Sequence, residues 1–261
     1  MRVDKYALYE ASVQAPEWDC KNLARIYKAH AGREARILRE DFCSTAAISA
    51  AWTARHRDNR AIGVDLDPEP LAWARAHRLP YLASAGRVTL VQGDVRVARE
   101  PKVDLACALN FSWWVFRQRA DLLAYLVASR KSLREGGILV LNAYGGTDAE
   151  LPTIEKTKKK AGTSIDGRRY PAFTYVWEHE HVNAIDRNLL AYIHFELSGG
   201  RSLKKAFTYD WRLWTLPEVR DVALEAGFSD FRIWKEDDGR LSRPRFMNNE
   251  DCWFANLVCV R

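Results

Sequence analysis

The sequence has no apolar stretch that is long enough to cross a membrane as a helix. Its longest apolar runs, such as 105–109 and 138–141, have about the length of a strand, whereas a bilayer requires about 20 apolar residues. The first residues, Met1 to Tyr6, also lack the apolar core of a signal peptide. We therefore expect a cytoplasmic protein that makes no contact with a membrane.

The cysteines show no spacing that is typical of a disulfide framework or a metal site. There are five cysteines, an odd number, and no two of them are spaced as C-x-x-C. This argues against a set of disulfides and against a zinc site, so no metal is expected. Cys107 and Cys259 lie in apolar runs and are expected to be buried packing residues. Cys43 lies in a turn of small residues, where packing is favoured over contact with a ligand.

Glycine-rich phosphate-binding patterns are also absent. The chain carries no G-x-G-x-x-G, which counts against a dinucleotide-dependent oxidoreductase. Instead, the stretch from Ile37 predicts a strand, then a turn of small residues over 44–47, and a helix that opens at Ala46. A strand, a tight turn and a helix N-terminus form the first unit of a nucleotide-binding α/β domain.

The composition supports one large α/β domain. The chain has 261 residues, of which 48% are hydrophobic, so it can bury a full core. The formal net charge is +6. One lysine-rich run, Lys156 to Lys160, is interpreted as exposed surface rather than as a nucleic-acid patch. Ten tryptophans are present, and such flat side chains can fill a core or line a pocket.

The first half of the chain alternates between strand-like and helix-like segments. Short apolar strands separated by helices indicate a parallel sheet that is covered on both faces. The strands are predicted at 35–39, 61–65, 88–92, 103–109 and 137–142, and the helices at 17–31, 46–57, 69–77 and 117–133.

The pattern changes after residue 146. Residues 150–170 are polar and are expected to form a loop. Long strands without helices between them then indicate a small antiparallel sheet, with a hairpin turn at Ser198-Gly-Gly200. The final two strands flank a polar loop and suggest an antiparallel hairpin at the edge of the main sheet. The predicted elements are strands at 173–181, 188–197 and 201–211, a helix at 217–226, a strand at 228–235, a loop at 236–251 and a strand at 252–260.

These elements predict a Rossmann-like, doubly wound α/β fold. We expect a mostly parallel seven-stranded sheet with an antiparallel C-terminal strand, plus the small inserted antiparallel sheet. The expected division is an N-terminal lid and helix over 1–32, the main domain over 33–148 and 212–261, and the inserted sheet over 149–211.

Polar side chains follow the predicted strands. Ligands of a doubly wound sheet bind beyond these strand ends. The carboxylate of Asp65, after the second strand, can accept hydrogen bonds from two ribose hydroxyls, and Asp94, after the third, can accept one from an adenine amine. Such acids also cap helices and turns, but their shared position at one sheet edge predicts a nucleotide site. The residues at this edge are Glu40, Asp65, Asp94, Asn110 and Ser112.

These residues resemble class I S-adenosylmethionine-dependent methyltransferases. Val64-Asp-Leu-Asp-Pro68 is similar to the second motif of that family, and Gly93-Asp-Val95 to its third. Leu133-Arg-Glu-Gly-Gly-Ile-Leu-Val140 is similar to the stretch that leads into the fifth strand. The resemblance covers nearly the whole chain, including its final two strands.

The first motif resembles that of one subgroup, E-D-F-C-G-T-A, which replaces the usual D-x-G-x-G-x-G. Here it reads Glu40-Asp-Phe-Cys-Ser-Thr-Ala46, so Phe42, Ser44 and Ala46 occupy the three glycine positions. Ser44 departs even from the subgroup, in which glycine is expected. Segments that look like further signatures of the subgroup lie at 143–146, 173–177, 192–195 and 207–214.

The resemblance implies S-adenosyl-L-methionine as the cofactor. Glu40 is then the acidic anchor near the amino-acid end of this molecule, and an insertion after the fifth strand usually roofs the substrate pocket. The cofactor-binding residues implied are Glu40, Phe42, Cys43, Ser44, Asp65, Leu66, Asp94, Val95, Asn110 and Ser112.

The resemblance also implies methyl transfer by direct in-line displacement, here to a small-molecule acceptor through a nitrogen, oxygen or sulfur atom. The enzyme mainly has to hold the acceptor opposite the methyl group and exclude water. Aromatic faces suit this task because they attract methylated cations. Trp113 and Trp114 cannot easily both belong to the core, so at least one should reach the pocket. The expected substrate-binding residues are Tyr9, Trp113, Trp114, Trp177, Arg212 and Trp214.

His194 and Tyr144 are the candidate catalytic residues. An unperturbed histidine titrates near neutral pH and can serve as a general base, although a single histidine in a strand more often has a structural role. His179, His181 and Arg212 are weaker candidates.

Other functions remain open from the sequence. An RNA or protein methyltransferase is one alternative, but the chain has neither an N-P-P-Y type motif nor a helix with clustered arginines and lysines. A non-catalytic nucleotide-binding protein is another. The sequence does not identify the acceptor atom or the oligomeric state, and a homodimer is one option.

Overall fold

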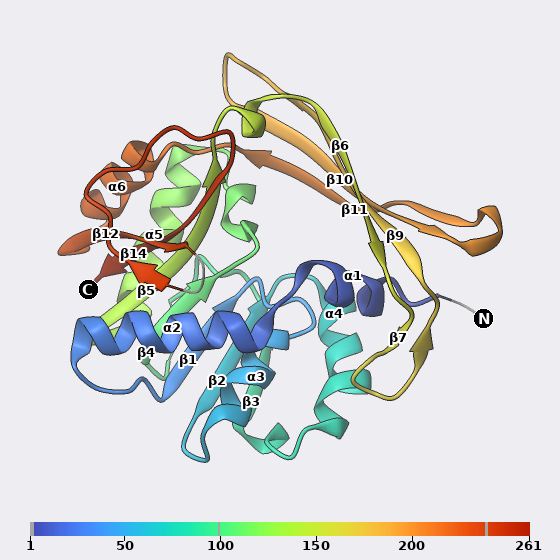
Figure 1. Ribbon diagram of the computed structural model, residues 1–261. Coiled ribbons are helices and arrows are strands. Elements are labelled where there is room, and N and C mark those ends of the chain that lie inside the picture. The colour runs from blue at the N-terminus through green and yellow to red at the C-terminus, as the bar shows by residue number, and fades with distance from the viewer. Residues whose placement is uncertain (1–2, 99, 238–239) are drawn as a thin grey trace.

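A mixed eight-stranded sheet forms the centre of the molecule (Figure 1). The computed structural model describes residues 3–98, 100–237 and 240–261. The strands of this sheet are β1 (Ile37–Asp41), β2 (Arg60–Asp65), β3 (Val88–Gln92), β4 (Val103–Ala108), β5 (Leu133–Gly145), β12 (Asp230–Asp237), β13 (Arg240–Ser242) and β14 (Trp253–Val260). Their order is β13-β12-β14-β5-β4-β1-β2-β3. β1 to β5 run parallel, and β14 is antiparallel to both of its neighbours.

This order confirms the predicted Rossmann-like fold and locates its ligand edge. The order reverses between β1 and β4, and in such sheets ligands bind beyond the carboxyl ends of the strands at that point. The sheet has eight strands instead of the expected seven. The additional strand is β13, which pairs with β12 and lies in the segment 236–251 that was expected to be a loop. β13 has only three residues, of which Leu241 alone is apolar, so no alternation marks it as a strand. Residues 238–239 of the segment lie outside the described residues.

Helices cover both faces of the sheet. α2 (Pro16–Ala31) and α3 (Ala47–Arg55) cover one face, and α5 (Arg119–Ser132) and α6 (Leu216–Glu225) cover the other. β4 shows how this is achieved, because all of its residues are buried and alternate residues enter the two cores. Leu105 and Cys107 pack with α2 and α3, whereas Ala106 and Ala108 pack with α5 and α6. Within the described residues, no helix is both long and apolar enough to span a membrane.

A second, antiparallel sheet lies over the ligand edge (Figure 1). It consists of β6 (Thr153–Lys159), β9 (Phe173–Val182), β10 (Asn188–Leu197) and β11 (Ser202–Arg212), in the order β11-β10-β9-β6. The three long predicted strands are confirmed. The expected loop over 150–170 was wrong, because it contains β6 and a short hairpin of β7 (Gly162–Thr163) and β8 (Arg169–Tyr170). β6 is an edge strand with several lysines, and Ile154 is its one aliphatic side chain, so its sequence resembles a loop.

The N-terminal segment begins with a helix that the sequence did not reveal. α1 (Lys5–Val13) starts at Asp4, whose side chain accepts hydrogen bonds from the amides of Tyr6 and Ala7. Four consecutive residues, from Tyr6 to Tyr9, are buried, because α1 lies between the second sheet and α4 (Pro68–Trp73). A helix that is covered on more than one side has no single apolar stripe, and so no helical period was visible.

Candidate active site

The turn after β1 adopts the backbone of a glycine-rich loop without containing glycine. Phe42, Ser44 and Ala46 have positive φ angles of 57°, 47° and 58°. These are the three positions at which the usual first motif has glycine, and a left-handed conformation costs a non-glycine residue about 1–2 kcal/mol. Hydrogen bonds help to hold the turn, since the Cys43 amide donates to the Val64 carbonyl at 3.0 Å and the Ala46 amide donates to the Cys43 carbonyl at 2.6 Å.

Side-chain packing also holds the turn after β1 in place. Phe42 contacts the rings of Phe116 and Tyr125 with centroid distances of 5.7 and 5.9 Å. A Cβ atom at Gly63 on β2 would lie 2.9 Å from the Cys43 sulfur, so Cys43 packs directly against that glycine. This agrees with the packing role expected for Cys43.

Asp65 joins the turns that follow β1 and β2. Its Oδ2 accepts a hydrogen bond from the Ser44 amide at 2.7 Å, and its Oδ1 accepts one from the Asp67 amide at 2.9 Å. Burial raises the pKa of this carboxyl group. The two amides fix the orientation of the carboxylate, and each oxygen has a further lone pair that can accept a ligand hydroxyl.

Glu40 is buried beneath the start of α3. Its Oε2 accepts hydrogen bonds from the amide and the hydroxyl of Ser49, at 2.7 and 2.6 Å. Burial is the main cause that raises the pKa of Glu40 to about 7, and the hydrogen bonds from Ser49 oppose it. A carboxyl group so far from water and close to its titration point gains stability when a cation approaches it.

The remaining residues predicted at this edge differ in exposure and in their partners. Asp94 forms an ion pair with Arg96, with Oδ2 at 2.8 Å from the guanidinium. Leu66 is exposed and Val95 is buried. The Ser112 hydroxyl donates to the Leu109 carbonyl at 2.8 Å, which fixes its orientation within the chain. Asn110, two residues after the end of β4, has a positive φ of 53°.

A cavity of about 460 Å³ opens beside Asn110, and we call it the aromatic cavity. It lies between the carboxyl ends of β4 and β5, the helix α1 and the second sheet. Its aromatic lining consists of Tyr9, Phe111, Tyr144, Tyr175, Trp177, Tyr209, Trp211 and Phe254. Ring centroids lie 4.3 Å apart for Tyr209 and Trp211 and 4.7 Å apart for Phe111 and Tyr144, so the walls are closely packed.

The polar lining of the aromatic cavity is acidic. Asp148 and Glu155 contribute carboxylates, and the residues described there include no lysine or arginine. His179 is only 3% exposed, and its Nε2 has no hydrogen-bond partner among the described residues. Burial lowers the pKa of His179, which favours a neutral ring. The buried hydroxyl of Tyr144 also has no partner among the described residues, and burial raises its pKa.

The structure brings only some of the predicted substrate and catalytic residues to this cavity. Tyr9, Tyr144 and Trp177 line it. The expectation that Trp113 or Trp114 reaches the pocket was wrong, because both are fully buried.

Each of these two tryptophans has a core position. The Trp113 indole donates to the Asn142 carbonyl at 2.8 Å. Trp114 packs behind the cavity wall, with ring centroids 4.8 Å from Tyr144 and 5.8 Å from Trp211.

Trp214, Arg212 and His194 also lie away from the cavity lining. The Trp214 indole donates to the Phe116 carbonyl, and Arg212 stacks on Trp214 at 3.8 Å. The Nε2 of His194 lies 2.8 Å from Glu178, and its Nδ1 accepts from the Lys205 amide. His194 neighbours the cavity residue Ile193 along β10, and adjacent strand residues point to opposite faces. The expectation that His194 is catalytic was therefore wrong, because the residue faces away from the cavity.

Alternation along β9 is the signal that could have found the cavity face. Tyr175, Trp177 and His179 line the cavity at intervals of two residues, which is the period of one face of a strand. The same face can be extended to β6, where Glu155 lies opposite Trp177 and Thr153 lies opposite His179.

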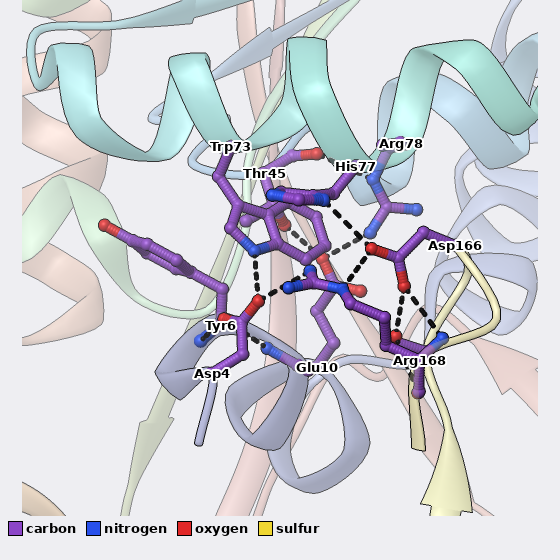
Figure 2. A network of polar contacts seen from close by, with 11 residues as sticks. Asp4, Tyr6, Glu10, Thr45, Trp73, His77, Arg78, Asp166 and Arg168 are labelled. Carbon is purple, nitrogen blue, oxygen red and sulfur yellow. Dashed lines mark hydrogen bonds and ion pairs between the residues drawn. The ribbon is translucent and has the colours of Figure 1, made fainter. Parts of the chain in front are cut away.

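A polar network ties α1 to the ligand edge, as Figure 2 shows. The Glu10 carboxylate accepts hydrogen bonds from the Thr45 hydroxyl and the Arg78 guanidinium. Arg78 also donates from Nε to the Thr45 carbonyl at 2.7 Å. Thr45 belongs to the first-motif turn, and α1 supplies Tyr9 to the aromatic cavity. The network therefore connects the two parts of the site.

The same network reaches the β7–β8 hairpin. Asp4 accepts from the Trp73 indole at 2.7 Å and from Arg168 at 2.8 Å. Asp166 lies 2.5 Å from Arg168 and 2.9 Å from His77. The start of α1, the helical segment 68–78 and the hairpin are thus held together by side chains.

Comparisons with known proteins agree with this geometry. Residues 41–141 match a family model described as a methyltransferase domain. No curated protein matches the chain in sequence. The matched segment contains the turn after β1, the acids after β2 and β3, and the strands β4 and most of β5.

Solved structures share the fold over the whole chain. CalS10 from Micromonospora echinaspora, described as an amino pentose methyltransferase bound to S-adenosylmethionine, has 18% identity and a TM-score of 0.71, covering 100% of this chain and 98% of its own. DesVI from Streptomyces venezuelae has 19% identity and a TM-score of 0.73, with coverage of 100% and 99%. The sugar N-methyltransferase KedS8 from a Streptoalloteichus species has 18% identity and a TM-score of 0.69, with coverage of 100% and 94%. Part of the chain is thus similar to a methyltransferase domain, and the whole chain shares its fold with solved S-adenosylmethionine-dependent methyltransferases.

Proposed function

We propose that the protein transfers the methyl group of S-adenosylmethionine to a small molecule that binds in the aromatic cavity. The observation that carries this proposal is the position of the cavity, which opens beside Asn110 at the carboxyl edge of the sheet. Its volume of about 460 Å³ is typical of small-molecule pockets. CalS10 and KedS8, which share the fold, are described as methyltransferases of an amino pentose and of a sugar.

The residues at the edge fit the cofactor. S-adenosylmethionine supplies an electrophilic methyl group on a sulfonium. Asp65 is oriented by two amides and can accept hydrogen bonds from the ribose hydroxyls, and we assign Asp94 to the adenine side. Glu40 is a buried carboxylate that an ammonium group would stabilise. The backbone of the turn over 42–46 and the residues Leu66, Val95, Asn110 and Ser112 complete the proposed cofactor site.

The protein's own contribution to transfer is to position the acceptor and to exclude water. The second sheet and α1 enclose the aromatic cavity from the side opposite the strand ends. We therefore propose that residues 1–32 act as a lid and that residues 149–211 act as the roof of the substrate site. The division into a main domain over 33–148 and 212–261 belongs to the same proposal.

The contacts that the lysine-rich run makes within the protein favour a small acceptor over RNA or protein. Lys156 forms an ion pair with Glu196 at 2.7 Å, and Lys159 donates to the Ser12 carbonyl at 3.2 Å. These lysines support the structure of the edge strand β6 rather than a free cationic surface. All five cysteines are unpaired, which fits a reducing compartment, and we propose that the protein works in the cytoplasm.

Methyl incorporation from S-adenosylmethionine labelled in its methyl group tests the proposal. We expect label to enter low-mass products from a small-molecule extract, and not to enter transfer RNA or protein. Trp177→Ala should lower this incorporation while leaving cofactor affinity unchanged, because Trp177 lines the acceptor cavity and not the turn after β1. Label that enters only RNA or protein would contradict the proposal.

A further inference from the structure

We propose that the methyl acceptor is a basic amine, which the carboxylates of Asp148 and Glu155 select within the walls of the aromatic cavity. This inference rests on the proposed function, because it names the acceptor class of the same site. Three observations carry it: the sign of charge in the cavity, the placement of Glu155, and a buried histidine with an unused nitrogen.

The charge of the cavity is opposite to that of the chain. The protein has 40 lysines and arginines against 34 aspartates and glutamates. The cavity nevertheless has two carboxylates and, among its described lining residues, no cationic side chain. An acidic, partly enclosed site attracts cations and repels carboxylate and phosphate groups. Neither Asp148 nor Glu155 forms an ion pair with a described residue, so both carboxylates are available to a ligand.

Glu155 faces the aromatic walls. It lies opposite Trp177 in the pairing of β6 with β9, and residues directly opposite one another point to the same face. Its charge contributes, after burial, to the raised pKa values of Tyr144 and Tyr175, which places its carboxylate near both rings. An ammonium group beside Glu155 would therefore also lie near aromatic faces, where cation–π attraction adds to the ion pair.

His179 gives an independent sign of a ligand. It lines the cavity, yet it is 97% buried by the protein, and its Nε2 has no partner among the described residues. A hydrogen bond with the backbone of His181 is the ring's other polar contact among the causes that shift its pKa. A buried nitrogen without a partner costs about 1–3 kcal/mol, and a ligand N–H group placed in the cavity removes that cost.

The chemistry of an amine acceptor balances with these groups. An aliphatic amine has a pKa of about 10 and therefore enters the site as an ammonium ion. One N–H proton passes to Nε2 of His179, whose ring is neutral because burial lowers its pKa. The nitrogen lone pair then bonds to the methyl carbon as the bond from that carbon to sulfur breaks, and the electron pair leaves with the sulfur. The product is a methylated ammonium ion, so the positive charge of the sulfonium passes to the acceptor.

The tyrosines of the cavity and Cys252 do not supply an alternative proton acceptor at neutral pH. Burial raises the pKa of Tyr9 to about 12 and raises the pKa values of Tyr144, Tyr175 and Tyr209 as well. Burial also raises the pKa of Cys252. These groups stay protonated at pH 7, and we assign the transferred proton to His179, which lines the same cavity.

Three probes that share one skeleton test the inference: 2-phenylethylamine, 2-phenylethanol and phenylacetate. Binding is measured by calorimetry in the presence of saturating S-adenosylhomocysteine. We expect the amine to bind at least about 10-fold more tightly than the alcohol and the carboxylate. Glu155→Gln combined with Asp148→Asn should abolish this preference and leave the affinity of the alcohol unchanged.

Glu180→Gln is the matched control, because Glu180 follows His179 on β9, is exposed, and is not among the residues that line the cavity. It should retain the preference for the amine. His179→Gln should lower the rate of amine methylation at pH 7 and recover part of it at pH 9, where more of the amine is free.

Tighter binding of the alcohol or of the carboxylate overturns the inference, as does no binding of the amine at millimolar concentration. An amine preference that survives loss of both carboxylates also overturns it. Failure of the wild type to bind S-adenosylhomocysteine at all would instead overturn the proposed function, so the two failures are distinguishable.

Discussion

Glu40→Gln tests two roles of Glu40 in one substitution: its effect on folding stability and its proposed role in binding the cofactor. Gln keeps the shape of Glu40 and retains an oxygen that can accept the two hydrogen bonds from Ser49. It removes the negative charge that burial makes unfavourable. The two proteins therefore differ in a single buried titration and in the proposed anchor for the cofactor's ammonium group.

The expected size of the effect follows from the pKa. Burial raises the pKa of Glu40 to about 7 in the folded protein, whereas an unfolded chain has about 4.3. Between these values the folded state binds more protons than the unfolded state, so this group's contribution to stability is lost as the pH rises through the window. The loss amounts to at most about 3.5 kcal/mol by pH 8. Glu40→Gln has no such titration.

Urea unfolding of both proteins, without cofactor, at pH 5 and pH 8 measures the difference. The free energy of unfolding of the wild type should fall by up to about 2.5 kcal/mol more than that of Glu40→Gln between these two pH values. At pH 8 the affinity of Glu40→Gln for S-adenosylmethionine should be at least about 10-fold lower than that of the wild type. Parallel stability changes in the two proteins would refute the argument from burial, and an unchanged affinity would refute the role of Glu40 as anchor.

Three further substitutions test neighbouring parts of the account. Asp65→Ala should weaken binding of S-adenosylmethionine at least about 10-fold by calorimetry without a change in fold, whereas Asp58→Ala, at the opposite edge of β2, should not; equal affinities would show that Asp65 does not hold the cofactor. Ser44→Gly should change the free energy of unfolding by about 0 to +1 kcal/mol, because relief of the left-handed strain exceeds the entropy cost of glycine; a loss above 1 kcal/mol would contradict this. Glu10→Gln should increase amide exchange in α1 and raise the KM for the acceptor; unchanged exchange would show that the contacts to Thr45 and Arg78 do not hold the helix.

The parallel sheet was predictable because its signals are local. Apolar runs such as 103–109 alternate with helical segments, and an acid lies at the end of β2 and another shortly after β3. The shared position of these acids at one edge then follows from the parallel direction of the strands. The left-handed turn at 42–46 was harder to foresee, because no glycine marks it.

The parts that were missed depend on contacts between distant segments. α1 is covered on more than one side, so its apolar residues show no stripe, and β6 is a lysine-rich edge strand. Trp113 and Trp114 could both be buried because β5 and β11 supply partners on two sides. The difference between His179 and His194 depends on which face of the second sheet meets the main sheet, and this is set only when the two sheets pack together.

The central claim is that the carboxyl edge of the sheet holds S-adenosylmethionine with its methyl group directed into the aromatic cavity. A crystal structure of the complex with S-adenosylhomocysteine tests it most directly. We predict that the ribose hydroxyls contact Asp65, that the amino-acid end lies toward Glu40, and that the sulfur faces the cavity beside Asn110. A nucleoside bound elsewhere, or a sulfur atom that faces away from the aromatic cavity, would contradict the account.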